Sequence, residues 1–316
     1  ATVFALGQSV AELAIGRGLI GLGVSACLMA AFKAFSLWFP PSRQASLTGW
    51  IMTSGGLGAL AATAPLEFAL QVSGWREIFF ALAGLTLAVA IWLFFSIPEQ
   101  YSQSKPESLA AQLAGVKAVF GSAHFWRFVP IGLTLTGGFM AVQSLWSISW
   151  LMQVNGYSRA AAADHMAGMS VAMLTAYILI GLLATGLARR GIQPVMLLAA
   201  GVGLSLLMLA LIATEALSQT HLLWIAYGTF SSFGTLVYSQ AAAGFPVALS
   251  GRVNTALNLM VFIGAFGVQW GLGLLIDLLQ QLGQNPALAH RSAFLVLLGI
   301  QSTAYAWFCI ASRRPR

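Results

Sequence analysis

The sequence predicts an all-α polytopic membrane protein, and three observations support this fold class. Charged residues make up only 7% of the 316 residues, against about 25% in ordinary globular chains. Apolar residues make up 59%, which is more than a soluble fold of this size can keep away from water. These residues form continuous runs of about 20, the length that a helix needs to cross a bilayer. Disordered chains and transmembrane barrels are excluded, because neither contains such runs.

Nine runs of this kind follow one another, and we predict a membrane-spanning helix in each. The breaks between them carry turn residues, such as Asn155-Gly156 and Asn285-Pro286, which are typical of loops. A tenth, incomplete run covers 1–6. The nine predicted spans are 13–37, 46–70, 77–97, 128–151, 166–187, 194–212, 222–243, 256–279 and 294–311.

The positive charges are distributed unequally between the two ends of these spans. Eleven of the fifteen Lys and Arg residues lie in one set of alternate loops, where only two acidic residues oppose them. Because such an excess marks the cytoplasmic side, we expect a cell (plasma or inner) membrane protein with a cytoplasmic C-terminus. The net charge of +7 therefore indicates membrane sidedness, and we predict no nucleic-acid partner.

Residues that carry enzymatic or metal chemistry are not arranged in any familiar pattern. Cys27 and Cys309 both lie inside apolar runs, so a disulfide framework is not expected. The sequence has no zinc-protease, P-loop or serine-hydrolase motif and no Cys/His cluster. We therefore predict neither an enzyme nor a bound cofactor or metal.

An internal repeat relates the first three spans to the last three. The matching residues keep their order, and their offset grows only in loops, from 206 to 215. The middle three spans have no counterpart, so we expect a protein of two six-helix halves from which about 80–90 N-terminal residues are absent. The matched pairs are Phe39-Pro40 with Phe245-Pro246, Arg43 with Arg252, Gly55 with Gly264, Gly58 with Gly267, Glu67 with Asp277, Arg76 with Arg291, Phe79 with Phe294, and Gly84 with Gly299.

This repeat divides the chain into three predicted regions. Residues 1–97 form the C-terminal part of the N-terminal half, from the end of its third helix to its sixth. Residues 98–127 form a cytoplasmic linker, in which Leu109, Leu113, Val116 and Phe120 recur at helical spacing and predict a short amphipathic helix. Residues 128–316 form the complete C-terminal six-helix half.

Two like-oriented halves with a basic linker resemble the major facilitator superfamily. The motifs that carry the resemblance are RGLIGLGVSA at 17–26, Ser-Arg at 42–43 before a Gly-rich helix, Gly-Trp-Arg at 74–76, and the shape of 181–190. The resemblance covers the whole chain as family helices 4–12, and it implies solute transport. The chain departs from the family pattern at Thr185 and Gly186, where an acidic and a basic residue are expected, so a charge-based latch is not expected there.

The resemblance implies that the helices at 13–37, 128–151 and 222–243 line a central cavity. Arg17 lies about one helical turn inside the outer boundary, where it either binds an anionic group or extends its charge to the membrane surface. Tyr227, Ser231 and Tyr238 share one helix face, which fits either the cavity or hydrogen bonding between helices. The predicted substrate-pathway residues are Arg17, Gln143, Trp146, Tyr227, Ser231, Tyr238 and Gln269.

Four further charged residues are predicted to act in gating or in the loops. Arg43 and Arg252 are paired by the repeat on the cytoplasmic side, and Glu67 and Asp277 are paired near the outer rim. No Asp or Glu lies deep in any predicted span, so the proton carrier of a proton-coupled transporter is expected outside these spans. His165 beside Asp164 at the outer edge is the weaker candidate for that role.

We therefore predict secondary transport of a small organic solute by alternating access, with the halves rocking about a midplane site. An anionic solute is expected if Arg17 contacts it, and the driver is expected to be either an ion gradient, of H⁺ or Na⁺, or facilitated diffusion. The predicted partners are this solute and the lipid bilayer, and the predicted state is a monomer. The alternative is a membrane sensor or scaffold that keeps the fold without transporting.

Overall fold

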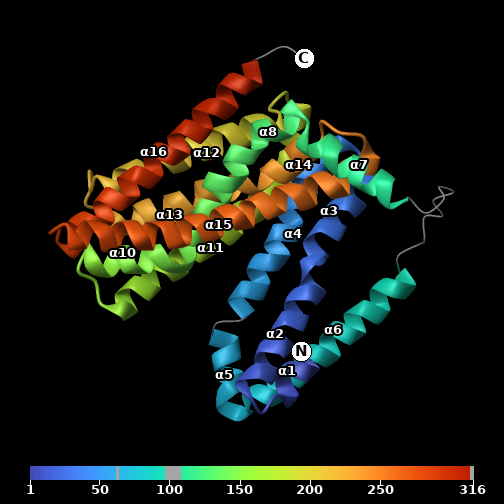
Figure 1. The fold of residues 1–316 in the computed structure, drawn as a ribbon, viewed down its shortest axis with the longest axis horizontal. Coiled ribbons are helices and arrows are strands. Elements are labelled where there is room, and N and C mark those ends of the chain that lie inside the picture. Colours follow the sequence, from blue (N-terminus) through green and yellow to red (C-terminus); the bar gives the residue numbers. More distant parts are fainter. Residues whose placement is uncertain (62–63, 97–107, 314–316) are drawn as a thin grey trace. The chain divides into compact units, whose positions relative to one another are not determined.

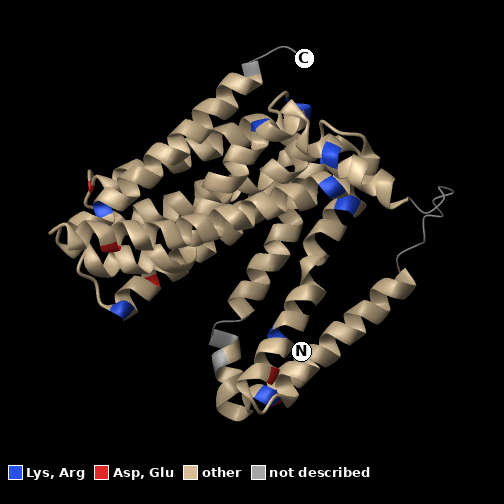
Figure 2. Ribbon diagram, in the orientation of Figure 1, with Lys and Arg blue, Asp and Glu red and all other residues tan. Residues whose placement is uncertain are grey.

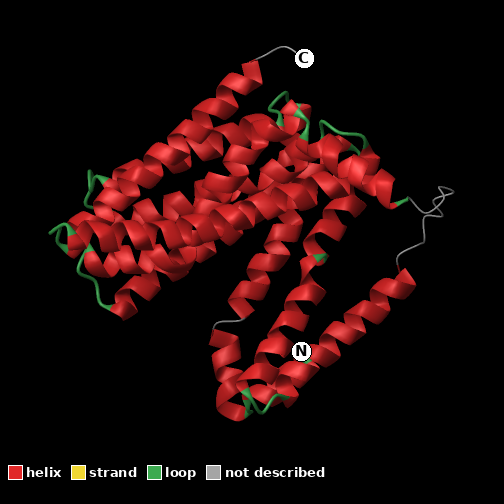
Figure 3. Ribbon diagram, viewed as in Figure 1, coloured by secondary structure: helices red, strands yellow, loops and turns green. Residues whose placement is uncertain are grey.

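The computed structural model describes residues 1–61, 64–96 and 108–313, and all the regular structure in those ranges is helical (Figures 1 and 3). The chain divides into two compact units. Unit one contains 1–31 and 57–114, and unit two contains 32–56 and 115–316. Each unit is described separately below.

Unit one is built on α2 (Val10–Ser25) and α6 (Trp75–Ser96), with the short helices α1 (Thr2–Leu6) and α5 (Ala64–Val72) at their ends. Ser9 caps α2, because its hydroxyl accepts a hydrogen bond from the Glu12 amide at 3.2 Å. The chain turns at Ala26 before α3 (Cys27–Trp38), so 13–37 is one apolar stretch made of two helices. Both α3 and α4 (Pro41–Ala61) belong partly to unit one and partly to unit two.

Unit two is a bundle whose long elements run back and forth along a common direction (Figure 1). Its first span, 123–153, combines three α-helices with two π-helical segments, which leave room for an extra residue in each wide turn. The elements of unit two after the linker are α7 (Leu109–Phe120, which begins in unit one), α8 (Ala123–Pro130), η1 (Ile131–Thr136), α9 (Gly137–Ala141), η2 (Val142–Trp146), α10 (Ser147–Gln153), α11 (Arg159–Arg189), α12 (Pro194–Ala213), α13 (Thr220–Ser231), η3 (Ser232–Thr235), α14 (Leu236–Ala242), η4 (Val247–Leu249), α15 (Ser250–Gln281) and α16 (Pro286–Arg313).

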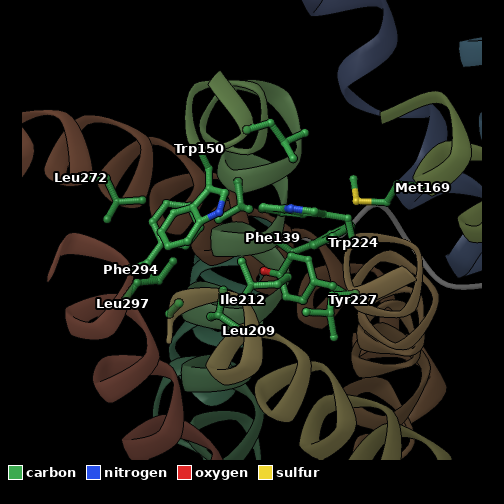
Figure 4. Packing of buried hydrophobic residues seen from close by; sticks show 14 of the residues in the cluster. Phe139, Trp150, Met169, Leu209, Ile212, Trp224, Tyr227, Leu272, Phe294 and Leu297 are labelled. Carbon is green, nitrogen blue, oxygen red and sulfur yellow. The ribbon is translucent and has the colours of Figure 1, made fainter. Parts of the chain in front are cut away.

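The core of unit two is made of large aromatic and aliphatic side chains from α9–α13, α15 and α16 (Figure 4). Trp150 packs on Phe294 with ring centroids 4.5 Å apart. Phe139 packs edge-on against Tyr227 at 5.4 Å. Between helices in a bilayer, such close packing rather than the hydrophobic effect holds the bundle together.

Seven helical stretches of the described residues are long and apolar enough to cross a membrane. They fall on seven of the nine predicted spans. The predicted span 46–70 instead covers α4, α5 and the two residues between them that lie outside the described residues. The predicted span 222–243 covers α13, η3 and α14, where a 3₁₀ turn interrupts the helix. The membrane fold is thus confirmed, while the count of nine spans stays a prediction.

The surfaces of these helices suit a lipid environment. None of the apolar window of α6 is buried, and Trp92, Phe94 and Phe95 are all exposed. A helix is present in the predicted linker as α7, on which Leu109, Leu113 and Val116 are exposed, whereas Phe120 packs against Phe125 with ring centroids 5.3 Å apart.

Charges gather at the two ends of unit two (Figure 2). One end carries Lys and Arg, and the opposite end carries both signs. The pattern agrees in direction with the loop asymmetry of the sequence, on which the expected sidedness rests.

Candidate functional site

The predicted substrate-pathway residues fall into separate groups in the structure. Arg17 lies exposed on α2 in unit one, whereas the other six lie in unit two. Within unit two they form three groups, on α15 with η2, on α13, and on α14. Their assignment to a solute pathway stays a prediction.

Trp146 and Gln269 lie in contact in the structure. The indole Nε1 of Trp146 donates a hydrogen bond to the backbone carbonyl of Gln269 at 3.1 Å. The side chain of Gln269 is exposed, and that of Gln143, on the same π-helical segment as Trp146, is half-buried. The indole therefore joins η2 to α15, and contact of the two amide side chains with a solute stays a prediction.

Tyr227 and Ser231 line one small void of about 10 Å³ inside the bundle, together with Ser205 and Gln301. Tyr227 is only 2% exposed and belongs to the aromatic core. Gln301 donates to the Thr134 carbonyl at 2.8 Å. The ring of Tyr227 packs against Phe139, and the choice between the cavity and hydrogen bonding between helices for these polar groups stays open.

Tyr238 lies on α14, which is found toward the end of unit two that carries Lys and Arg (Figures 1 and 2), and it is not part of the core cluster. Its hydroxyl donates a hydrogen bond to Asn258 Oδ1 at 2.9 Å. Its ring stacks on Phe32 of α3 with centroids 5.1 Å apart. Nothing in the sequence indicated this stack, because Phe32 and Tyr238 are separated by about 200 residues.

The four predicted gating residues have different surroundings. Arg43 and Asp277 are exposed. The guanidinium of Arg252 lies against Gly115 of α7, where it would meet a Cβ at 2.6 Å. Glu67 lies on α5, but its side chain is outside the described residues.

A neutral contact occupies the place where the family pattern has charges. Ser46 Oγ and Thr185 Oγ1 are 2.7 Å apart, and the Thr185 amide donates to Ser46 Oγ at 3.1 Å. Next to them, Gly49 of α4 packs so closely on Gly181 of α11 that a Cβ on Gly49 would overlap the Gly181 backbone. The departure at Thr185 thus has a structural counterpart, a hydroxyl pair that joins α4 to α11.

The opposite end of unit two holds a polar cluster that the sequence analysis missed. Glu215 forms an ion pair with Arg291 and accepts a hydrogen bond from Asn155 Nδ2 at 3.4 Å. Glu215 has a φ of 49°, a strained conformation for a non-glycine residue. The cluster borders a cavity of about 240 Å³ lined by Trp150, Asn155 and Glu215 among others. Only the charge of Glu215 and Arg291 could have indicated it.

Histidines occupy two places near this end. His290 lies 2.8 Å from Ser149 Oγ and 2.7 Å from the Pro286 carbonyl. His165 packs against His221 and Tyr157, with ring centroids 4.6 and 4.7 Å away. Among the described residues, no three His, Cys, Asp or Glu side chains could together hold a metal ion.

Comparison with known proteins gives concordant results. The family model of the Major Facilitator Superfamily matches residues 1–268. A galacturonate transporter of Dickeya chrysanthemi is 28% identical over 116 residues, which are 36% of this chain and 34% of that protein. A hexuronate transporter of Escherichia coli (strain K12) is 30% identical over 92 residues, which are 29% of this chain and 21% of that protein. These matches therefore span about a third or less of the relatives' own lengths.

Among solved structures, a crystal structure of the Escherichia coli fucose:proton symporter FucP is similar in fold. Its TM-score is 0.74, with 16% sequence identity, and the match covers 99% of this chain and 80% of that chain. At this identity the likeness concerns the fold alone.

Proposed function

The chain belongs to the Major Facilitator Superfamily, and from this membership we propose that it carries out secondary transport of a small organic anion by alternating access. The protein would lie in the plasma or inner membrane as a monomer with a cytoplasmic C-terminus. An ion gradient, of H⁺ or Na⁺, would drive the transport, because the sequence contains no nucleotide-binding motif.

One observation carries the mechanism. At the end of unit two that carries Lys and Arg, α3 and α4 contact helices that follow them by more than 100 residues. Phe32 stacks on Tyr238, and Ser46 pairs with Thr185. Both contacts join uncharged side chains. Alternating access needs such a closure, firm enough to seal one end and weak enough to open during each cycle.

The substrate class that we propose is a sugar acid of hexuronate size. Two relatives are named as galacturonate and hexuronate transporters, and a hexuronate carries one carboxylate and several hydroxyl groups. Arg17 is suited to the carboxylate, because a guanidinium binds it with two parallel hydrogen bonds. The amides of Gln143 and Gln269 are suited to the hydroxyls, since an amide both donates and accepts.

The test is uptake by the purified protein in proteoliposomes, with galacturonate compared with galactose. These two sugars match in shape and differ in the carboxylate. We expect saturable uptake of galacturonate. Galactose should compete with this uptake at least about tenfold more weakly than unlabelled galacturonate does. Arg17→Ala should raise the KM for galacturonate about tenfold. Arg17→Lys, which keeps the charge but loses the paired geometry, should have an intermediate KM.

Two outcomes would contradict parts of this proposal. Equal uptake of both sugars, or an unchanged KM in Arg17→Ala, would remove the anionic substrate and the role of Arg17. Saturable binding without uptake into vesicles, under any H⁺ or Na⁺ gradient, would favour the sensor or scaffold alternative.

A further inference from the structure

The cavity of about 240 Å³ beside Glu215 contains none of the residues proposed for the transport pathway. Its walls come from α10, α12, α13 and the loops that precede α11 and α13. Leu217 and Ser218 line it and are exposed, so the cavity reaches the surface of unit two. Its volume equals that of roughly eight water molecules in the liquid, which is room for one sugar ring. We call it the Glu215 cavity.

Part of the lining of the Glu215 cavity is apolar and firmly held. Trp150 lines the cavity, and its ring packs on Phe294 with centroids 4.5 Å apart. Ile212 and Leu223 also line it, and both belong to the core cluster with Trp150 (Figure 4). Sites for small molecules are typically built in this way, from a preformed apolar wall and a few polar groups.

Asn155 adds a buried acceptor without a partner to this cavity. Its Nδ2 donates to Glu215 Oε1 at 3.4 Å, and since a carboxylate only accepts, the amide nitrogen must be the atom that faces it. The Oδ1 of Asn155 is buried and accepts no hydrogen bond within the described residues. An unpaired buried acceptor costs free energy, which a donor from a bound ligand recovers.

Two hydroxyl groups complete the polar lining. Ser218 and Thr220 lie at the start of α13 and line the cavity. In the part of the chain that the structure describes, neither hydroxyl forms a hydrogen bond. A hydroxyl both donates and accepts, so the polar lining offers donors as well as acceptors to a ligand.

The charges around the Glu215 cavity indicate a ligand group without charge. Glu215 is the one charged residue among the described residues of the lining, and it is paired with Arg291. An anionic group therefore meets no cation there, and a cationic group competes with Arg291 for the carboxylate. Hydroxyl groups fit best, because each one donates to an acceptor such as Asn155 and accepts from a hydroxyl such as that of Thr220.

We propose that the Glu215 cavity is a second binding site, which takes the hydroxyl-bearing face of a sugar ring. The inference rests on the proposed function for the class of natural ligand, a sugar acid, and not for the existence of the site. A sugar acid binds there through its hydroxyls, with its carboxylate toward solvent. The cavity therefore binds galactose and galacturonate alike, whereas the proposed transport site with Arg17 distinguishes them.

The site is tested by hydrogen exchange of the loops at 154–158 and 214–220, measured on the full chain in detergent micelles. Galactose, galacturonate and choline are titrated separately at constant ionic strength. We expect both sugars to slow exchange in these two loops with the same half-saturating concentration, within about twofold. Choline, which offers a cation, should have no effect. The measurement needs no uptake, so its result is independent of the proposed transport.

Three variants change the lining of the Glu215 cavity in different ways. Thr220→Val removes one hydroxyl at similar volume and should raise the half-saturating galactose concentration about fivefold. Asn155→Leu removes the unpaired acceptor and should raise it about tenfold. Leu217→Trp fills the mouth of the cavity and should abolish the protection.

Two matched controls lie close by and outside the lining. Thr214→Val removes a hydroxyl that is bound to the Ala210 carbonyl at 2.7 Å. Leu222→Trp adds the same bulk as Leu217→Trp at an exposed position that does not line the cavity. Both controls should bind galactose as the unmodified chain does.

Equal protection by the two sugars, weakened by the lining variants and kept by the controls, supports the second site. Absence of protection by galactose, protection by galacturonate alone, or equal protection by choline would overturn it. Equal weakening in the controls and in the lining variants would also overturn it. If Asn155→Leu does not fold, Thr220→Val decides, since its hydroxyl bonds to no other described residue. Protection without any uptake of galacturonate would contradict the proposed transport and leave the second site supported.

Discussion

The predicted repeat pairs Arg76 with Arg291, and each of these arginines binds a loop of its own unit. We call these two places the corners, and their chemistry differs. In unit one, Arg76 Nη2 donates to the Gly7 carbonyl at 3.0 Å, and its guanidinium lies 4.3 Å above the Trp75 ring. In unit two, Arg291 pairs with the carboxylate of Glu215. In both, an arginine near the start of a helix binds the loop that precedes the fourth helix of the predicted half.

The difference shows which part of the repeat is retained. The position of the arginine and the loop that it reaches are the same in both units, whereas the acceptor has changed from a backbone carbonyl to a carboxylate. A carbonyl acceptor does not depend on the side chain in the loop, so unit one keeps its corner with glycine at that place. Unit two places Glu215 there with a positive φ, and its ion pair offsets that strain.

Burial also differs between the paired helices α6 and α16. Phe294 of α16 is fully buried against Trp150. Its partner in the repeat, Phe79 of α6, is half-buried against Phe4, although the ring centroids are also 4.5 Å apart. Because α16 packs on α12 and α15 while the described residues offer α6 only α1 and α5 as extensive neighbours, the same residue type contributes differently to stability.

The largest expected effect comes from the paired phenylalanines. Phe294→Ala should lower the free energy of unfolding by about 3–5 kcal/mol, because it opens a cavity in the aromatic core. Phe79→Ala should cost less than about 2 kcal/mol. Thermal unfolding in detergent micelles measures both, with Phe294→Leu as the control expected to cost less than about 1.5 kcal/mol. Equal losses for the two alanine variants would remove the contrast in burial.

Gly55 and Gly264, which the predicted repeat pairs, also differ in how closely other helices pack on them, and a smaller difference in stability is expected between their alanine variants. A Cβ on Gly264 would overlap the carbonyl oxygen of Leu133, whereas a Cβ on Gly55 meets no atom of the described residues within 4 Å. Gly264→Ala should therefore cost about 1–3 kcal/mol, and Gly55→Ala should stabilise α4 by up to about 1 kcal/mol. The same thermal measurement applies. A neutral Gly264→Ala would mean that α15 and η1 separate easily.

The smallest effect is expected at the two corners themselves. Arg291→Ala should cost about 1–2 kcal/mol and Arg76→Ala about 1 kcal/mol or less, since both arginines are partly or largely exposed. Hydrogen exchange of the loops at 7–9 and 214–219 reports each corner directly. High salt should weaken the corner at Glu215 more than the one at Gly7, because only the former pairs two full charges. Equal salt dependence would show that the change of acceptor has no energetic consequence.

Apolar length was enough to predict much of the fold. The span expected at 194–212 is the helix Pro194–Ala213, with Pro194 at the first turn where its missing amide is harmless. Long continuous runs determine such helices locally. The 3₁₀ turn at Ser232–Thr235 lies inside an apolar run, where composition alone carries no information on the backbone.

The candidate site was predictable only in part, because its contacts join distant residues. The pairing of Trp146 with Gln269 follows from two residues singled out in the sequence, yet the acceptor is a backbone carbonyl that no side-chain pattern could identify. The departure at Thr185 was visible, whereas its partner Ser46 was not. Uncharged residues such as Ser46 and Phe32 are common in membrane helices, so only the packing of the chain distinguishes them.

The wide π turns in the first span of unit two also affect how this helix tolerates change in length. Two such turns, at Ile131–Thr136 and Val142–Trp146, each absorb part of an additional residue within a helix that remains continuous. Removing one residue there would restore a regular α-helix and leave the face of the helix beyond it in place, so Trp150 would stay in the core. A deletion in the regular turn just before Trp150, at 147–149, would instead rotate the flanking segments by about 100° relative to each other. We therefore expect a single deletion at 131–136 or 142–146 to be less damaging than one at 147–149.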